Sequence, residues 1–261
     1  MFEATRTDGV SRLRREGARW LSTGYDGGFA DADAAYNVTV PNGFSRTDLG
    51  AFVAERRADA GFDDDGPALL TGVAQRHARR ARFGPVEAVV TAGLSNPASL
   101  PDEAREARRD SGDARGEPSV ATRAADDSPT TDSGGPTATG SDGPPTPGTV
   151  NVVLGTTRAL DAGTQANLLA LVAEARTATL LATTGFTGTT SDAAIVACDP
   201  TGDPAAFAGS ATEVGHAARV CVRDALRASL ASRYPDDGYP DSVADADHGV
   251  VTEGRADVSA L

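Results

Sequence analysis

The stretch from residue 97 to residue 147 constrains the fold more than any other feature of this chain. It is rich in Pro, Gly, Ser, Thr and Asp, and its sizeable apolar residues are limited to Leu100 and Val120. Ordering roughly 50 residues costs about 1–2 kcal/mol each, which so little apolar burial cannot offset. The sequence therefore predicts a disordered acidic insertion at 97–147. A long insertion costs little if its ends already lie close in the fold, and residues 1–96 and 148–235 are predicted to form one domain around it.

The acidic charge balance indicates adaptation to a salty cytoplasm rather than a surface for a charged partner. The 261-residue chain has 37 Asp and Glu residues against 24 basic ones, it lacks Lys, and its formal net charge is −13. A dense carboxylate surface keeps a protein dispersed where salt screens its self-repulsion, which is typical of halophiles. It argues against nucleic-acid binding, which needs a basic face. The C-terminal tail, residues 236–261, is also acidic and is predicted to be loose.

Several classes of chemistry are excluded by composition. No apolar run approaches the roughly 20 residues of a membrane span, and the N-terminus lacks a secretory signal, so we expect a cytoplasmic protein. In that setting Cys198 and Cys221 are predicted to be free buried thiols. No Cys/His cluster has metal-site spacing, and without Lys there is neither a Schiff base nor a Walker lysine. No protein-bound metal or cofactor is predicted, and the oligomeric state is left open.

Apolar periodicity predicts strands that alternate with helices. Strands are expected over GARWLSTG, which ends in a glycine turn, and over 34–41, 86–91, 149–155 and 192–198. Helices are expected over 48–59 after a Thr47 cap, over 67–81, over 162–183 after an Asp161 cap, and from Ser210 or Thr212 to 232. The basic cluster Arg76, Arg79, Arg80 and Arg82 is interpreted as a solvated helix face. The pattern favours an α/β or α+β fold: a single domain with a central mixed sheet flanked by helices.

Small polar residues gather where the predicted strands end. The segments LSTGYDGG, VTAGLSN, TVN and TTGFTGTTSD each place Thr, Ser, Asn or Gly beside an apolar strand. Such residues let backbone N–H groups and short side chains approach a ligand, and in open α/β sheets ligands bind at strand ends. Taken singly, each segment fits an ordinary turn. The four together leave a turn and a binding site as equal alternatives.

Three ionisable residues are candidates for acid–base chemistry. Glu174 has largely apolar helical neighbours, which predicts a partly buried carboxylate. Such a carboxylate can act as a general acid or base. The alternative is a structural pair with Arg176 or another Arg. Asp192 either caps a turn or orients a reacting group. His216 lies near the start of the last helix, where an imidazole is held more neutral and suits a base; the alternative is a packing residue.

The motifs, taken in order, resemble those of the adenosylcobinamide amidohydrolase family of halophilic archaeal type. The resemblance rests on LSTGYDGG, VVTAGLSNP, GTVNVVL, EARTATL, TGTTSDAAIVA and TEVGHAARV, and it covers residues 10–232 apart from the insertion. Two departures stand out. Arg176 replaces the family's usual Lys, which keeps the charge but changes its geometry. The segment TGTTSD also lacks one glycine of the family pattern.

The resemblance implies hydrolysis of the amide that joins a corrin propionate to aminopropanol, giving adenosylcobyric acid and aminopropanol for cobalamin synthesis. It implies that cobalt belongs to the substrate. The catalytic candidates are then Glu174, Asp192 and His216. A wide, amide-rich corrin needs a polar cleft, for which the expected substrate-binding residues are Gly27, Gly28, Thr91, Gly93, Ser95, Asn96, Asn151, Thr189 and Thr190.

Mechanism and class both retain alternatives. In one mechanism Glu174 or His216 activates water, while the loops at 93–96 and 189–190 stabilise the oxyanion. In the other, a strand-end hydroxyl such as Thr91 or Ser95 is a covalent nucleophile. The competing class is a non-catalytic corrinoid-binding or carrier protein, which needs the same loops but no buried acid. A general amidase without a corrinoid link is a third reading.

Overall fold

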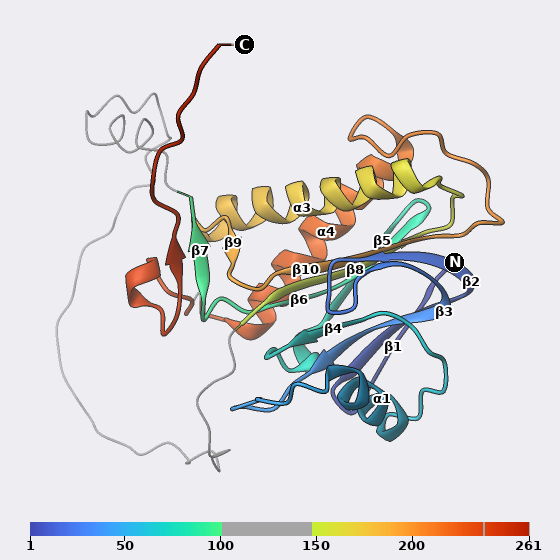
Figure 1. Cartoon of the computed structure of the whole chain (residues 1–261), viewed down its shortest axis with the longest axis horizontal. Coiled ribbons are helices and arrows are strands. Elements are labelled where there is room, and N and C mark those ends of the chain that lie inside the picture. The colour runs from blue at the N-terminus through green and yellow to red at the C-terminus, as the bar shows by residue number, and fades with distance from the viewer. Residues whose placement is uncertain (101–147, 237, 261) are drawn as a thin grey trace, which may run out of the picture.

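A computed structural model describes residues 1–100, 148–236 and 238–260 of the chain (Figure 1). The predicted insertion lies outside the described residues except at its first four positions. The elements are β1 (Glu3–Thr7), β2 (Val10–Ser22), β3 (Gly28–Thr39), α1 (Leu49–Asp59), β4 (Ala68–Thr71), the 3₁₀ turn η1 (Gln75–His77), β5 (Arg79–Phe83), β6 (Val86–Ala92), β7 (Pro97–Ser99), β8 (Val150–Thr156), α3 (Ala162–Thr184), β9 (Gly188–Thr189), β10 (Ala193–Cys198), α4 (Glu213–Arg233), the 3₁₀ turn η2 (Val243–Asp245) and β11 (Val250–Val251).

One mixed sheet of eight strands organises the domain. Its order is β4-β3-β2-β10-β8-β6-β5, with β1 paired to β2. The pairs β10–β8 and β3–β4 are parallel, and the other neighbours are antiparallel. The connection between β8 and β10 is α3, because parallel neighbours need a crossover. The predicted fold class, a central mixed sheet flanked by helices, is confirmed.

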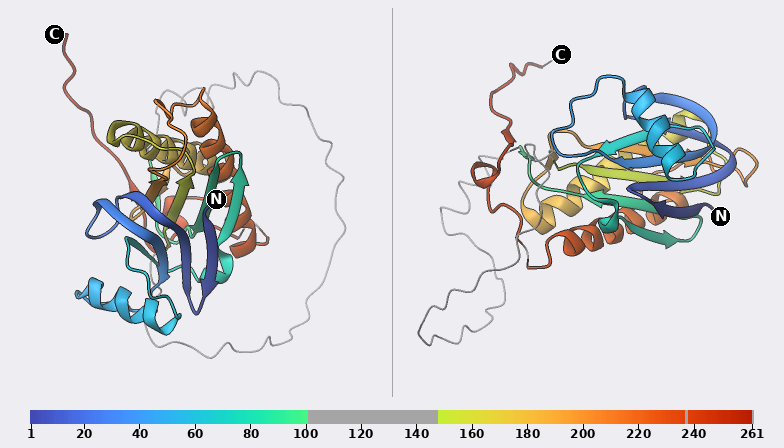
Figure 2. Two further views of the ribbon diagram at one scale, coloured as in Figure 1. Left: turned by 90° about the vertical axis from the view of Figure 1, so that its right-hand side faces the viewer. Right: turned by 90° about the horizontal axis from the view of Figure 1, so that it is seen from below.

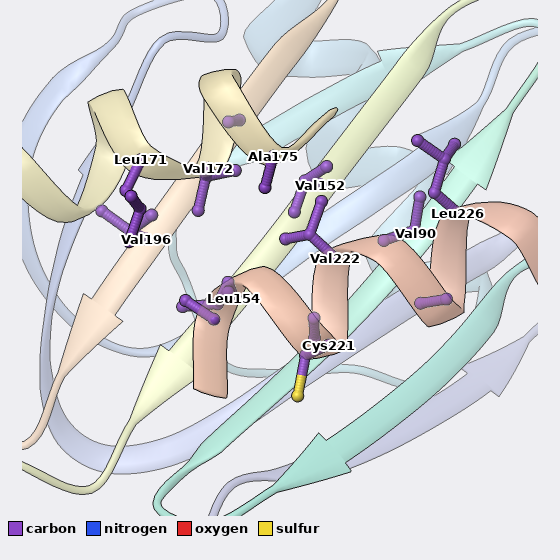
Figure 3. Packing of buried hydrophobic residues seen from close by; sticks show 14 of the residues in the cluster. Val90, Val152, Leu154, Leu171, Val172, Ala175, Val196, Cys221, Val222 and Leu226 are labelled. Carbon is purple, nitrogen blue, oxygen red and sulfur yellow. The ribbon is translucent and has the colours of Figure 1, made fainter. Parts of the chain in front are cut away.

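The central strands β6, β8 and β10 are buried on both faces. On one face α3 and α4 pack against them (Figures 1 and 3). The contacts in Figure 3 join Val90, Val152, Leu154 and Val196 of the strands to Leu171, Val172, Ala175, Cys221, Val222 and Leu226 of the helices. The alternate strand residues Val89, Val153 and Ile195 face a second cluster around Phe2 and Trp20. This double burial explains the continuous apolar runs in these strands.

The β2–β3 hairpin bends at a register shift between Arg14 and Ala18. The second half of β3, with β4, carries a third apolar cluster that α1 covers with Phe52 and Val53. In Figure 1, α1 lies on the opposite side of the sheet from α3 and α4. The helices therefore cover the sheet from both sides.

Two of the helices, α3 and α4, begin at a residue whose side chain caps the first turn with a hydrogen bond. Asp161 accepts a hydrogen bond from the Thr164 N–H at 2.7 Å, which confirms the predicted cap. Thr212 accepts one from the Gly215 N–H at 3.0 Å, so of the two predicted starts, Ser210 and Thr212, the second is the cap. The predicted Thr47 cap is wrong, because the first helix is preceded by Asp48 without a side-chain cap.

The predicted helix at 67–81 is wrong. Residues 68–71 pair with β3 and residues 79–83 pair with β6, with the short turn η1 between them. Residues 68–71 find their partner in the distant strand β3, whereas residues 79–83 form a tight hairpin with the next strand, β6. In both cases strand pairing overrides local helix propensity. Arg80 and Arg82 accordingly do not lie on a helix face: both form ion pairs with the fully buried Glu87 of β6.

A small second sheet, β11-β7-β9, lies beside the ends of the central strands. Residues 97–99, predicted as part of the insertion, form its middle strand β7. The tail contributes β11, and Tyr239 packs edge-on against Tyr234 at 6.0 Å, so the tail is not loose throughout. Figure 2 shows its last residues leaving the body of the molecule.

Both cysteines are free and buried, as predicted. Burial raises the pKa of the Cys221 thiol to about 11, so it is not a poised nucleophile. No helix among the described residues is long and apolar enough to cross a membrane.

Candidate active site

The polar strand ends predicted from the sequence meet at one edge of the sheet. Thr91 near the end of β6 is the register partner of Asn151 near the start of β8, and Asn151 is the partner of Ala193 at the start of β10. The hydroxyl and backbone N–H of Thr23, just after β2, both hydrogen-bond Ala194. We call this edge the strand-end site; it comprises Thr23, Asn37, Thr91, Ser95, Asn96, Asn151, Arg176, Thr189, Thr190 and Asp192.

A chain of side-chain amides forms the buried floor of the strand-end site. Asn151 Nδ2 donates to the Leu70 carbonyl at 2.9 Å and to Asn37 Oδ1 at 2.9 Å. Asn37 Nδ2 then donates to Thr91 Oγ1 at 2.8 Å. Because a backbone carbonyl can only accept, the Leu70 contact fixes the orientation of both amides and makes Thr91 the acceptor. All three side chains are buried, so they shape the site from beneath rather than line an open cleft.

Asn37 is a functional candidate that the sequence reasoning missed. It is the single amide in the largely apolar stretch AAYNVTV, where an inward-facing polar residue needs a partner. A lone amide in a predicted buried strand was the sequence signal that could have identified Asn37.

Asp192 is locked in place by donors from three elements. Its Oδ1 accepts the Val150 N–H of β8 at 2.9 Å and also the Thr189 hydroxyl, while Oδ2 accepts the Thr189 N–H of β9 at 2.9 Å. Arg176 of α3 places its Nε 3.5 Å from Oδ2. With its oxygens so engaged, Asp192 suits a positioning role, which matches the turn-capping alternative more closely than a reacting acid.

The accessible part of the site is made by the hydroxyls of Thr190 and Ser95, and the buried amide of Asn96 holds the first of them. Asn96 Nδ2 donates to Thr190 Oγ1 at 2.5 Å, and the Thr190 N–H donates to the Asn96 carbonyl at 3.2 Å. Ser95 Oγ accepts the Gly148 N–H at 2.6 Å. Thr190 is exposed and Ser95 partly so, whereas Asn96 is 1% exposed and its Oδ1 has no partner among the described residues. A buried amide that holds an exposed hydroxyl is an arrangement suited to binding a polar ligand.

The predicted glycines have different roles. A Cβ on Gly93 would lie 3.1 Å from the Gly148 Cα and 2.8 Å from a Val73 methyl, so Gly93 permits close backbone packing. Gly27 and Gly28 lie exposed in the β2–β3 turn, outside the hydrogen-bonded network, and Gly28 has φ +111°. This turn continues directly from Thr23.

Glu174 is not buried, which corrects the sequence expectation. Its side chain is 57% exposed and pairs with Arg219 of α4. The residues that make its helical neighbourhood look apolar include Ala170 and Ala178, which are themselves exposed. The core-facing side of α3 runs through Leu168, Leu171, Val172 and Ala175 instead. The structural alternative, a pair with another Arg, describes Glu174 as the structure has it.

His216 also lies away from the strand-end site. It occupies the first turn of α4, is exposed, and meets the Phe83 ring edge-on at 5.6 Å. The last turns of α4 are the ones at the strand-end site, because Ser229 Oγ accepts the Ala92 N–H at 3.0 Å. His216 instead lines a groove of about 270 Å³ on the outer face of α3 and α4, together with Arg219, Arg223 and Arg227.

His77 is the histidine that the fold brings near this edge. Its carbonyl accepts a hydrogen bond from Ser229 Oγ at 2.9 Å, and its Nδ1 is 3.1 Å from Ser232 Oγ. Burial, aided by the nearby charges of Arg76 and Arg233, lowers the pKa of His77. Within the described ranges, no three His, Cys, Asp or Glu side chains gather as a metal site would require.

Comparison with known proteins agrees with the motifs at this edge. The family model described as adenosylcobinamide amidohydrolase matches residues 2–237. An adenosylcobinamide amidohydrolase of Halobacterium salinarum is 50% identical over 263 residues, which cover 99% of each chain. No solved structure matches the chain significantly. The chain therefore belongs to the adenosylcobinamide amidohydrolase family. It is an amidohydrolase, which decides against the non-catalytic class predicted as an alternative.

Proposed function

We propose that this enzyme hydrolyses the aminopropanol amide of adenosylcobinamide, giving adenosylcobyric acid and aminopropanol in corrinoid salvage for cobalamin synthesis. The observation that carries the proposal is the convergence of the family motifs. Segments around residues 23, 91–96, 149–151 and 189–192 come from distant parts of the chain and meet at one hydrogen-bonded edge. The full-length relative in Halobacterium salinarum, an adenosylcobinamide amidohydrolase, supports the choice of substrate.

We place the reaction at the strand-end site rather than on the α3–α4 face. Hydrolysis adds the oxygen of water to the amide carbon and a proton to the leaving nitrogen, so the site must stabilise a developing oxyanion. The Thr190 hydroxyl can do so: its oxygen already accepts from Asn96 Nδ2, which directs its own proton away from Asn96. Asp192 then acts as a positioning residue, because it anchors the Thr189 backbone beside Thr190.

The direct test is to incubate the protein with adenosylcobinamide in molar KCl and to follow both products by mass spectrometry. Product that scales with enzyme concentration is the expected result. Tight binding of the corrinoid without any product would overturn the proposed reaction, because the bond that the enzyme cleaves would then lie in another substrate. Neither binding nor product, in protein shown to be folded, would overturn the substrate assignment.

The same assay separates the two mechanisms. A covalent hydroxyl mechanism leaves a corrinoyl ester on the chain, and the intact-protein mass shows it after rapid acid quenching. Attack by water gives no such adduct. We expect no adduct on Thr91, because its side chain is fully buried.

A further inference from the structure

A second pocket lies next to the strand-end site, on the outer side of β3. It has a volume of about 450 Å³, within the range of small-molecule sites, and lies between β3, α1, the β2–β3 turn and the segment before β4. Much of its wall is made of small residues, namely Ala30, Ala32, Gly50, Ala54, Gly66, Pro67 and Ala68. Nothing in the proposed hydrolysis uses this pocket.

The walls of the pocket are held rigidly by backbone contacts. A Cβ on Gly66 would lie 1.9 Å from the Ala34 carbonyl oxygen, and one on Gly24 would lie 2.8 Å from the Ala68 carbonyl oxygen. Both loops therefore press directly onto the sheet. Arg57 of α1 ties down the segment before β4 by donating to the Asp64 carbonyl at 2.8 Å and to Asp65 Oδ1 at 2.6 Å. A pocket held in this way is preformed and binds at a low ordering cost.

The chemistry of the rim favours an uncharged ligand with hydroxyl donors and a flat ring. Asp26, Asp31 and Asp65 line the pocket together with one cation, Arg57. Arg57 is paired with Asp65 and Arg19 with Asp31, whereas Asp26 makes no hydrogen bond or ion pair with the described residues and is the free acceptor of the rim. Carboxylates accept hydrogen bonds from the hydroxyls of a ribose, whereas they repel phosphate. Tyr25 supplies an aromatic ring beside them, and burial raises the pKa of its phenol, which keeps it neutral. A purine nucleoside combines these features.

The pocket is joined to the strand-end site by the motif LSTGYDGG. Thr23 bonds Ala194 at the start of β10, and Tyr25 and Asp26 line the pocket two and three residues later. Three residue steps span at most about 11 Å. One ligand can therefore reach both places, and the proposed substrate carries a nucleoside on its cobalt.

We propose that this pocket binds the adenosyl group of the corrinoid and makes the enzyme selective for the adenosylated form. The inference rests on the proposed function, since the ligand is part of that substrate. It explains why the β2–β3 turn carries family motif residues although Gly27 and Gly28 lie outside the hydrogen-bonded network.

Gly50 offers a clean way to fill the pocket. It lines the pocket from α1, is exposed, and has no atom within 4 Å of where a Cβ would lie, so a side chain can begin there without a clash and Gly50→Leu adds bulk at the pocket. Gly50→Ala is the matched control, because it makes the same change in helix propensity with little bulk. Kinetics are measured with adenosylcobinamide and with cyanocobinamide, in which cyanide replaces the adenosyl group.

We expect wild-type KM to be about tenfold lower for adenosylcobinamide than for cyanocobinamide. Gly50→Leu should raise KM for the adenosylated substrate about tenfold, with kcat within twofold, and should leave cyanocobinamide unaffected. Gly50→Ala should behave as wild type. Equal KM values for the two corrinoids in the wild type, or equal effects of Gly50→Leu on both, would overturn the inference while leaving the proposed hydrolysis intact.

A binding measurement keeps the two proposals separable. Titration calorimetry with 5′-deoxyadenosine alone should show binding to wild type and to Gly50→Ala, and none to Gly50→Leu. If no corrinoid is hydrolysed, the proposed function fails, while this titration still decides whether the pocket takes a nucleoside. Absence of nucleoside binding to the folded wild type would overturn the pocket assignment.

Discussion

Two acid–arginine pairs on α3 show how differently the same chemistry can be used. Arg176 faces inward to Asp192, whose side chain is 5% exposed and also accepts backbone N–H groups of β8 and β9. Two residues earlier, Glu174 faces outward to Arg219, and both side chains are exposed. The first pair joins a helix, a strand and a turn at the strand-end site, whereas the second joins two helix surfaces. Burial and the number of bonded elements, rather than the charges, separate a site from a surface.

The largest expected effect follows from breaking the inner pair. Asp192→Ala removes the acceptor for the Val150 and Thr189 N–H groups and leaves Arg176 without its carboxylate. Breaking a buried ion pair in this way lowers the free energy of unfolding by about 3–5 kcal/mol. Urea unfolding in molar KCl measures it.

Glu174→Ala is the matched control for that measurement. It deletes a carboxylate from the same helix, but from an exposed pair, for which the expected loss is at most about 1 kcal/mol. Comparable losses for the two variants would remove the distinction drawn between the pairs.

The next effect concerns activity at the exposed hydroxyl. Thr190→Val should lower kcat/KM for adenosylcobinamide about 100-fold by removing the donor to the oxyanion. Thr190 is exposed, so the cost to the fold is limited to the acceptor that the buried Asn96 Nδ2 loses, about 1–3 kcal/mol. Thr190→Ser should recover most of the activity. Steady-state kinetics with product detection provide the measurement.

The adjacent Ser191 supplies the control for Thr190. It is exposed too, and the structure gives it no hydrogen-bond partner among the described residues, so Ser191→Ala should leave kcat/KM unchanged. A retained rate in Thr190→Val would move the reaction away from this end of the sheet.

The outer face should contribute little to the reaction. Glu174→Gln and His216→Gln should keep kcat within about threefold of wild type, because both residues lie on the far side of the helices from the strand-end site. The measurement is kcat at saturating substrate. A loss of a hundredfold in either variant would restore the predicted acid–base role and place the active site in the outer groove.

The smallest expected effect is a pH dependence of stability from His77. Its folded-state pKa lies below its ordinary value, chiefly through burial, so the folded protein binds this proton less readily than the unfolded chain. The stability from the neutral form is complete above about pH 6.5 and is lost as pH falls through the lower folded pKa. Melting temperatures from pH 7 to 5 should fall less steeply in His77→Gln; identical slopes would contradict the assignment.

Local signals in the sequence determined much of this protein. The apolar runs at 86–91 and 149–155 predicted β6 and β8, and the caps Asp161 and Thr212 predicted the starts of α3 and α4. These predictions succeeded because a cap bond or a strand's apolar pattern involves only neighbouring residues. The ordered motifs likewise indicated the family, since their residues need only be read in sequence.

Tertiary structure alone decided which polar residues belong together. Residues 68–71 became a strand because β3, which is distant in sequence, supplies their hydrogen-bond partners. Residues 79–83 pair with the next strand, β6, in a hairpin that the helix prediction missed, and Arg80 and Arg82 found Glu87 there. Asn37 joined the site because β3 carries it to Asn151 and Thr91. Glu174 turned outward, although its neighbours looked apolar, because alanines on a helix are as compatible with solvent as with a core. Burial of a polar group depends on what arrives from elsewhere in the chain, which no local pattern contains.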